Sequence, residues 1–372
     1  MKVTRIQVFR YRLPFKAPVE LAGEAHAARN GFLLALHNEH GAIGWGEAAP
    51  LPGFSRESLQ ETWNGLVRCA RRLANQPPPE THAELEAAGL LEFLDARSVA
   101  FALETALLNL RAATEGRPLC AFLAERPAPA MRLNALLTGD DEGLLEKARG
   151  LAAAGYRAAK LKVGRASIAR DAALVKAVRA ALDPGITLRL DANQAWDYDA
   201  ALDFAGRVSG CAIEYIEEPL QNAYKLMQFA KNTGVPYALD ETLVRINRAL
   251  DEGGDALEPL DEVLRGAAAL VWKPSLVHYP NIGVAMQQRA APRARLVLSG
   301  AYESGVGTAA LANYAAAYSG GEVPVGLDTY ARLADDVLEA RLPLSTGRVP
   351  LAEVNARATR IDRDRLELVW ES

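Results

Sequence analysis

Cysteine is scarce in this sequence. Its three cysteines, Cys69, Cys120 and Cys211, are far apart and form no Cys-x-x-Cys pair. We therefore expect neither a disulfide framework nor a cysteine-based zinc site, and a reducing cytoplasm is the expected compartment. The five histidines also lack the spacing of metal ligands, so structural or solvated roles are expected for them.

Long hydrophobic runs and a large excess of one charge are absent as well. No apolar run reaches the length that spans a membrane, and the first residues lack the apolar core of a signal peptide. The formal net charge of −4 provides no basic field for nucleic acid. We expect a cytoplasmic protein that acts on a small molecule, without a membrane or nucleic-acid partner; the oligomeric state is not indicated.

The first third of the chain has the pattern of a small α+β domain, assigned here to residues 1–127. Strands are predicted at residues 2–13, 31–38 and 42–47, and helices at about 55–73, with Ser55 as N-cap, and at 96–114. Residues 15–29 and 50–55 are rich in proline and glycine, which predicts lid loops over a barrel mouth. For residues 15–29 an ordinary surface loop is the alternative.

From about residue 130, short apolar runs alternate with helical segments. Strands are predicted at 132–137, 158–163, 187–191, 212–217, 236–240, 268–273, 295–299 and 323–327, and helices at 142–154, 168–182, 199–208, 222–233, 260–266, 280–290 and 305–318. Eight strands separated by seven helices favour a closed α/β barrel over an open sheet. We assign residues 128–328 to this barrel and expect residues 329–372 to pack back on the first domain.

Acidic residues follow three successive strands of this predicted barrel. Asp191, Glu217 and Asp240 each stand at the end of a short apolar run. A parallel barrel gathers its strand C-termini around one mouth, so the three carboxylates would converge and would repel one another without a cation between them. Oxygen-only ligands suit Mg²⁺. Taken singly, each acid could instead cap a helix or lie on a surface loop.

Three lysines accompany these acids. Lys160 and Lys162 are two positions apart in a predicted strand and therefore project to the same face. Inside a barrel their repulsion would favour loss of a proton from one of them, whereas a solvent-facing pair is the alternative. Lys273 follows an apolar run and would face Lys162 across the mouth as a second cation or base. A Schiff-base lysine is a further alternative, which the nearby carboxylates disfavour.

The combination of these segments resembles the enolase superfamily. The matching segments are Lys160-x-Lys162, Asp191-x-Asn193, Glu217-x-Pro219, Asp240-Glu241 and Lys273-Pro274-Ser275. The motifs Gly44-Trp45-Gly46-Glu47 and Gly326-Leu327-Asp328-Thr329 extend the resemblance to the muconate-lactonizing subgroup and, within it, to the o-succinylbenzoate synthase family. This resemblance implies a (β/α)7β TIM-like barrel with an α+β capping domain formed by both ends of the chain.

The resemblance also implies an activity and a set of residue roles. It implies a magnesium-dependent lyase that dehydrates 2-succinyl-6-hydroxy-2,4-cyclohexadiene-1-carboxylate to o-succinylbenzoate in menaquinone biosynthesis. Mg²⁺ would be held by Asp191, Glu217 and Asp240. Lys162 would remove the proton alpha to the carboxylate, Lys160 would support it, and Lys273 would stabilise the enolate from the opposite face. Implied substrate contacts are Arg29, Asn193, Ser299 and Gly326, and implied supporting residues are Arg189, Glu218 and Glu241.

Two other functions stay open at this point. Sister activities of the same superfamily, an N-acylamino acid racemase or a dipeptide epimerase, use the same metal ligands and lysines. A non-catalytic metal-binding barrel is the third possibility, which the complete set of lysines disfavours. One segment, Ser299–Ser304, departs from the family pattern, in which further serines follow the seventh strand.

Overall fold

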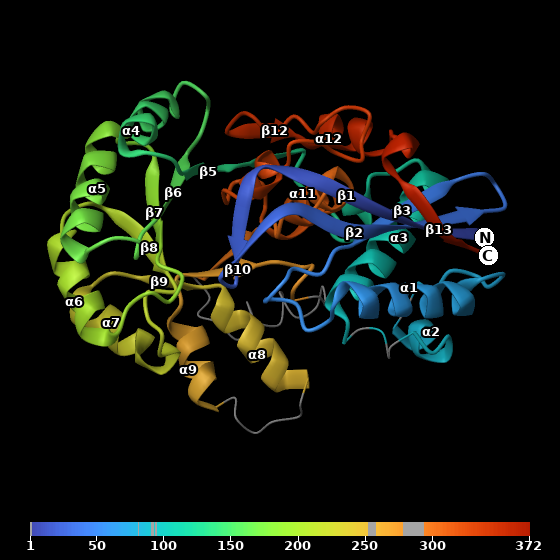
Figure 1. Ribbon diagram of the computed structural model, residues 1–372, viewed down its shortest axis with the longest axis horizontal. Coiled ribbons are helices and arrows are strands. Elements are labelled where there is room, and N and C mark those ends of the chain that lie inside the picture. Colours follow the sequence, from blue (N-terminus) through green and yellow to red (C-terminus); the bar gives the residue numbers. More distant parts are fainter. Residues whose placement is uncertain (1, 81, 91–92, 94, 252–257, 278–293) are drawn as a thin grey trace.

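The computed structural model describes residues 2–80, 82–90, 93, 95–251, 258–277 and 294–372. A four-stranded antiparallel sheet and a seven-stranded parallel sheet organise these residues (Figure 1). No helix in these ranges is both long and apolar enough to cross a membrane.

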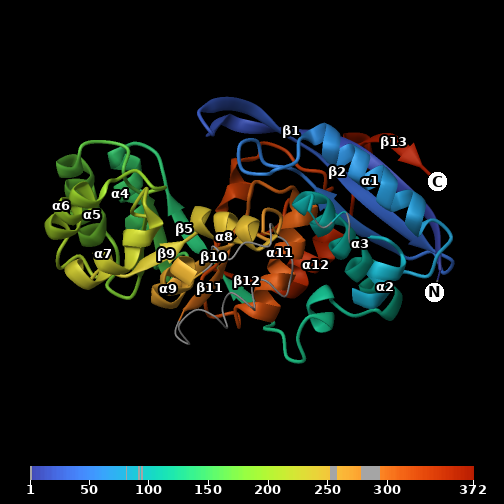
Figure 2. The ribbon, with the colours of Figure 1, turned by 90° about the horizontal axis from the view of Figure 1, so that it is seen from below.

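The antiparallel sheet contains strands from both ends of the chain. Its order is β13-β1-β2-β3, so the last strand pairs with the first, and both chain ends lie on the same side of the molecule (Figures 1 and 2). Apolar side chains of the sheet pack against two helices, α1 and α3. The elements are β1 (Val3–Leu21), β2 (Glu24–Asn38), β3 (Ile43–Ala48), β13 (Glu367–Glu371), α1 (Leu59–Leu73), α2 (His82–Ala87) and α3 (Arg97–Glu115).

The segment 15–29, expected to be a loop, is a β-hairpin. β1 continues to Leu21, and β2 begins at Glu24 after a two-residue turn. The register of the two strands shifts between Pro14 and Val19. This irregularity interrupts the two-residue alternation of apolar and polar residues on which the strand prediction depends. The predicted strand therefore ended at residue 13, before the end of β1.

The predicted N-cap of α1 was also wrong. Ser58, not Ser55, caps the helix and forms a capping box with Glu61. The Ser55 hydroxyl instead accepts a hydrogen bond of 2.9 Å from the backbone N–H of Leu51. Ser55 has Ser58 three positions later, and Ser58 has Glu61. Both serines therefore resemble N-caps in the sequence, and the earlier one was predicted.

The parallel sheet follows the order of the chain, from β5 to β11. Its strands are β5 (Asn134–Leu137), β6 (Ala158–Lys162), β7 (Thr187–Asp191), β8 (Ile213–Glu217), β9 (Tyr237–Leu239), β10 (Ala269–Trp272) and β11 (Arg295–Leu298). The predicted connecting helices form close to their expected positions as α4 (Asp141–Gly150), α5 (Ile168–Ala181), α6 (Tyr198–Arg207), α7 (Leu226–Thr233), α9 (Glu258–Gly266) and α11 (Gly305–Tyr318). Figure 1 shows α4 to α7 along the outside of this sheet.

The eighth predicted strand, residues 323–327, pairs only through single bridges. One bridge joins Val325 to Leu133 at the start of the sheet, and another joins Gly326 to Ser299 at its end. Because the segment contacts both edges, it closes the curled sheet, and the expected (β/α)7β barrel with an α+β cap is confirmed.

Several elements were not predicted. They include α2, α8 (Glu241–Asp251), α12 (Leu351–Ala358), and the short antiparallel pair β4 (Ala130–Arg132) and β12 (Arg348–Pro350). α8 begins two residues after β9 ends. No glycine or proline lies between them to mark the boundary between strand and helix in the sequence. The helix predicted at 280–290 lies outside the described residues.

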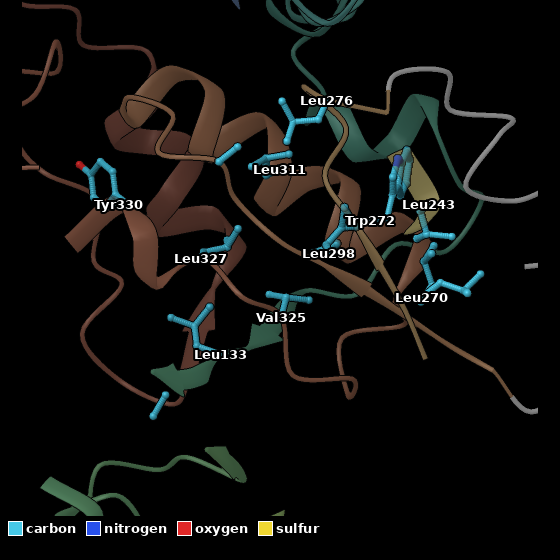
Figure 3. Packing of buried hydrophobic residues seen from close by; sticks show 14 of the residues in the cluster. Leu133, Leu243, Leu270, Trp272, Leu276, Leu298, Leu311, Val325, Leu327 and Tyr330 are labelled. Atoms are coloured by element: carbon cyan, nitrogen blue, oxygen red, sulfur yellow. The ribbon is translucent and has the colours of Figure 1, made fainter. Parts of the chain in front are cut away.

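Large apolar side chains fill the space between the barrel strands and α11 (Figure 3). Trp272, the last residue of β10, is 1 % exposed, and its indole N–H donates to the Val277 carbonyl at 2.8 Å. Its ring stacks on the ring of Tyr314 in α11, with the two ring centroids 6.1 Å apart. This packing fixes the end of β10 and therefore the position of Lys273, the next residue.

Candidate active site

The strand ends place the predicted charged residues together at one mouth of the barrel. Lys162 pairs in register with Asp191, and Asp191 with Glu217, along β6, β7 and β8. Asp240 directly follows β9, and Lys273 directly follows β10. A cavity at this mouth is lined by all three lysines and by Asp191 and Asp240, while Glu217 lies beneath it, 1 % exposed.

Each of the three carboxylates is paired with a lysine ammonium group. Lys160 Nζ lies 2.8 Å from both carboxylate oxygens of Glu217 and 2.9 Å from Asp191 Oδ2. Lys273 Nζ lies 2.5 Å from Asp240 Oδ2. The two lysines thus neutralise acids that would otherwise repel one another in a buried place.

Burial and these pairings together shift the pKa values of Lys160, Glu217 and Asp191. Burial would lower the pKa of Lys160, but the three carboxylates outweigh burial and raise it well above its ordinary value. Burial raises the pKa of Glu217 well above its usual range. Burial also pushes the pKa of Asp191 upward, but Lys160 and Lys162 overcome this effect and lower it. The surrounding carboxylates therefore favour the charged form of Lys160.

Lys162 differs from the other two lysines. Among the described residues its Nζ donates to no carboxylate at hydrogen-bond distance: it lies 3.9 Å from Asp191 Oδ2 and donates to Asn193 Oδ1 at 3.0 Å. Burial, and then the positive charges of Lys160, Arg165 and Lys273, lower the pKa of Lys162. A lysine with a lowered pKa in a cavity can accept a proton from a bound molecule, which is the property of a general base.

Lys273 has the opposite tendency. Burial would lower its pKa, but Asp240 and Glu241 outweigh burial and raise it. Its surroundings therefore favour the charged form of the Lys273 ammonium group. The two sides of the cavity differ, with a lysine of lowered pKa on β6 and a lysine of raised pKa after β10.

The acidic residues form a donor set that fits a hard divalent cation. Asp191, Glu217 and Asp240 offer only oxygen, are buried, and come from successive strand ends. In the part of the chain that the structure describes, no three acidic, histidine or cysteine side chains already converge on a metal position, since each of these acids faces a lysine. The fit rests on donor chemistry and placement.

Glu218 ties together the loops that carry the three acids. Its carboxylate accepts hydrogen bonds from the Asp240 N–H at 2.9 Å, the Thr242 N–H at 2.7 Å and the Gln194 side-chain amide at 2.9 Å. Glu218 and Gln194 both adopt positive φ, at 43° and 60°, which costs energy for residues other than glycine. The fully bonded Glu218 carboxylate stabilises this strained arrangement.

The other predicted supporting residues lie close by. Asn193 donates to Glu241 Oε1 at 3.1 Å, and burial raises the pKa of Glu241 to about 7. Glu241 Oε2 is buried without a hydrogen-bond partner. Arg189 lies deeper in the barrel, where it pairs with Glu214 at 2.6 Å and donates to the Pro324 carbonyl at 2.8 Å. Arg189 therefore braces the barrel interior beneath the charged residues.

The wall opposite the acids comes from β5, β11 and the segment that closes the barrel. Ser299 and Gly326, both predicted as substrate contacts, line it, and the Ser299 hydroxyl donates to the Gly326 carbonyl at 3.2 Å. Asn134 also lines it, is 3 % exposed, and has a buried Oδ1 without a partner. Asn134 was not predicted from the sequence, although an asparagine inside an apolar strand was a visible signal.

The hairpin tip and the segment after β3 cover the cavity. Glu20 and Leu21 of the hairpin line it together with Leu51 and Phe54. Both predicted lid segments therefore reach the mouth where the lysines lie. The side chains that they contribute, apart from Glu20, are apolar and can exclude water from a bound molecule.

Arg29, predicted as a substrate contact, is not among the residues that line this cavity, and that role stays a prediction. Its guanidinium group donates to the carbonyls of Ala49, Pro50 (2.6 Å) and Tyr302 (3.3 Å), and the residue is 3 % exposed. These three bonds use the guanidinium to join β2 to the segment after β3 and to the loop after β11. The sequence could not reveal this, because buried arginines and ligand-binding arginines have the same local pattern.

Comparisons with known proteins match both sheets. Residues 3–110 match the family described as "MenC, N-terminal domain", and residues 143–355 match "Enolase C-terminal domain-like". The o-succinylbenzoate synthase of Yersinia enterocolitica is 32% identical over 369 residues, covering 98% of each chain.

A second sequence relative and a solved structure also match this chain. The chain is 31% identical over 377 residues to Protein PHYLLO, chloroplastic, of Arabidopsis thaliana, covering 91% of this chain and 21% of that protein. A crystal structure of a dipeptide epimerase from Enterococcus faecalis, complexed with Mg and the dipeptide L-Leu-L-Tyr, superposes with a TM-score of 0.77 at 20% identity, covering 94% of this chain and 97% of that one. The chain belongs to the o-succinylbenzoate synthase family of the enolase superfamily.

Proposed function

We propose that this protein is a magnesium-dependent lyase that converts 2-succinyl-6-hydroxy-2,4-cyclohexadiene-1-carboxylate to o-succinylbenzoate in menaquinone biosynthesis. The observation that carries the proposal is the match to o-succinylbenzoate synthase along 98% of both chains. The unequal lysines across the cavity support it, because dehydration on one face of the ring needs only one base.

Lys162 carries the proton transfer. Its neutral amine takes the hydrogen from the carbon that bears the carboxylate, and the C–H electron pair moves into the carboxylate as an enolate. The pair then returns to form the ring double bond while the neighbouring C–OH bond breaks. The hydroxyl leaves as water with the proton that Lys162 took, and the ring becomes aromatic.

The remaining charges hold the enolate. Lys273 faces the ring from the side opposite Lys162 and stabilises the developing negative charge, and Lys160 adds a second fixed cation. Asp191, Glu217 and Asp240 would hold Mg²⁺, which supplies positive charge to the substrate carboxylate when bound. Asn193, Ser299 and Gly326 are proposed to contact the substrate.

A turnover assay tests this function. The purified protein is incubated with the cyclohexadiene substrate, with and without Mg²⁺, and the aromatic product is followed by absorbance and chromatography. Product formation that depends on Mg²⁺ is expected. A protein that leaves this substrate unchanged while it inverts N-acylated amino acids would overturn the proposal.

A racemase or epimerase is the second candidate, because Lys162 and Lys273 line the same cavity as two bases would. Deuterium wash-in distinguishes the two functions. An N-succinyl amino acid is incubated with the protein in heavy water, and both exchange at the alpha carbon and inversion are measured. Inversion faster than o-succinylbenzoate formation would favour the racemase.

A further inference from the structure

The motif Gly44-Trp45-Gly46-Glu47 has no role in the chemistry described above. Its strand, β3, packs so closely on α3 that a Cβ on Gly46 would lie 1.9 Å from the Ala102 carbonyl oxygen. The glycines therefore let the strand lie directly on the helix. This close packing fixes the direction in which Glu47, at the end of the motif, leaves the cap.

Glu47 reaches out of the cap to the start of α11 in the barrel. It is 1 % exposed, and each of its oxygens accepts one backbone and one side-chain hydrogen bond. Oε1 accepts from the Ser304 N–H at 2.9 Å and the Tyr11 hydroxyl at 2.5 Å. Oε2 accepts from the Gly307 N–H at 2.8 Å and the Ser304 hydroxyl at 2.5 Å.

The residues around this carboxylate leave no alternative position for it. A Cβ on Gly307 would lie 2.7 Å from Glu47 Oε2, so a side chain there would displace the carboxylate. Glu303 is itself held by the Ser275 hydroxyl at 2.5 Å and the Ala301 N–H at 2.6 Å. The turn between the loop and α11 is thus fixed from the cap on one side and from the barrel on the other.

This turn is the end of the loop that forms one wall of the catalytic cavity. Ser299, Ala301 and Tyr302 line that wall, opposite the acids. Tyr302 adopts a positive φ of 64°, and its ring meets Phe15 of the lid hairpin edge-on at 5.5 Å. A loop in a strained conformation needs its ends held, and Glu47 holds the end that leads into α11.

We propose that Glu47 is a positioning residue for the dehydration: the cap places the substrate-facing loop 299–304 through the Glu47 carboxylate. The inference rests on the function proposed above, in which that wall is part of the substrate-binding cavity. It assigns to the cap a second task besides covering the cavity, namely setting the shape of the cavity wall that receives the part of the substrate remote from the acids.

Glu47→Gln tests this proposal, because glutamine has nearly the size of glutamate but has an amide N–H donor in place of one acceptor oxygen. Both oxygens accept a backbone N–H, so in either orientation the glutamine amide would point its own N–H group at a backbone donor. One bond to the start of α11 must therefore break. We expect kcat/KM to fall about tenfold to a hundredfold, mainly through a higher KM.

Two control variants separate positioning from general loss of stability. Tyr11→Phe removes one bond to Glu47 but keeps both backbone bonds, and should change kcat/KM less than about threefold. Glu57→Gln alters another buried cap carboxylate, which accepts the Ser98 N–H at 2.8 Å within the cap. Its kinetic constants should stay close to those of the unmodified protein.

Hydrogen exchange gives a readout that needs no activity. In Glu47→Gln, amides in a peptide covering residues 299–308 should exchange about tenfold faster, while Glu57→Gln leaves them unchanged. The proposal fails if Glu47→Gln matches Glu57→Gln in both exchange and KM. Should the unmodified protein not dehydrate the cyclohexadiene at all, the proposed function fails, yet the exchange comparison still decides whether Glu47 holds the loop.

Discussion

At the scale of single residues, the site shows how surroundings give one residue type different roles. Lys160 and Lys273 each contact a carboxylate within 3 Å, whereas Lys162 contacts an asparagine oxygen. The first two have raised pKa values and the third a lowered one. Residue identity alone could not assign these roles, because they follow from which acids each ammonium group meets.

Replacing each of the two opposed lysines by arginine should have unequal effects. Arginine keeps the positive charge but cannot act as a base near neutral pH. Lys162→Arg is expected to lower kcat about a thousandfold, the usual contribution of a general base. Lys273→Arg should lower it on the order of tenfold. Steady-state kinetics on both variants checks this, and equal losses would contradict the assignment of the base.

The metal proposal predicts a loss of Mg²⁺ affinity when one acid is neutralised. Removing divalent ions with a chelator should abolish turnover, and Asp240→Asn should weaken Mg²⁺ binding roughly tenfold or more, because a charged oxygen ligand is lost. Titration calorimetry measures the affinity directly. The adjacent Glu241→Gln serves as the control and should weaken binding less.

Asn134 offers a test in which activity and stability change in opposite directions. Its buried Oδ1 has no partner, so Asn134→Leu should preserve or raise Tm, whereas KM should rise roughly threefold to tenfold if the amide contacts substrate. Asn313→Leu is the matched control, since that amide bonds to Asn355 at 2.7 Å and to Ala309 at 2.9 Å. The control should lower Tm. An unchanged KM for Asn134→Leu would exclude a contact with substrate.

At the scale of elements, the segment 15–29, predicted as a lid loop, is a hairpin. Its tip pairs Val19 with His26, Glu20 with Ala25 and Leu21 with Glu24. A hairpin moves as a unit, because its strands are joined by backbone hydrogen bonds. The position of the hairpin tip therefore depends on the cap sheet, whereas the position of a free loop would depend only on the contacts that the loop itself makes.

Shortening this hairpin should weaken substrate binding without unfolding the protein. Removing residues 20–25 takes away the last two pairs and the turn, and an Asn-Gly turn can then join Val19 to His26, which are paired in the full hairpin. We expect KM to rise on the order of tenfold, since water then enters the cavity, while the circular-dichroism spectrum is kept. A KM equal to that of the full chain would show that the tip has no part in binding.

At the scale of the whole molecule, the two ends of the chain meet in one sheet. β13 pairs with β1, and Glu371 binds Arg5 at 2.8 Å and the Gln7 amide at 3.0 Å. The cap therefore depends on residues that come after the barrel in the sequence. The division of the chain into residues 1–127, 128–328 and 329–372 stays a prediction.

Removing residues 367–372 should lower the stability of the cap. The truncation leaves one edge of β1 without a partner strand and breaks the contacts of Glu371, so Tm is expected to fall by about 4 °C for a loss of about 2 kcal/mol. Differential scanning calorimetry measures it. The conservative variant Glu371→Gln, which keeps the strand, should change Tm by less than half as much.

The sequence by itself determined the barrel, most of its strands and helices, and the convergence of its charged residues. Those features follow from local periodicity and from the rule that parallel strands end at one mouth. Each charged residue, from Lys160 to Lys273, stands next to an apolar run, so its place in the fold is encoded within a few residues of it.

Only the tertiary structure decided which contacts those residues make. The hairpin at 15–29, the binding of Arg29 to three carbonyls, the unpartnered Asn134 and the path of Glu47 to α11 all depend on residues far apart in the chain. Hydrogen bonds and burial across such distances leave no local pattern, since either partner alone looks like any buried polar residue. For this protein the sequence specified where charge gathers, and the tertiary contacts of each charged group specified what it does.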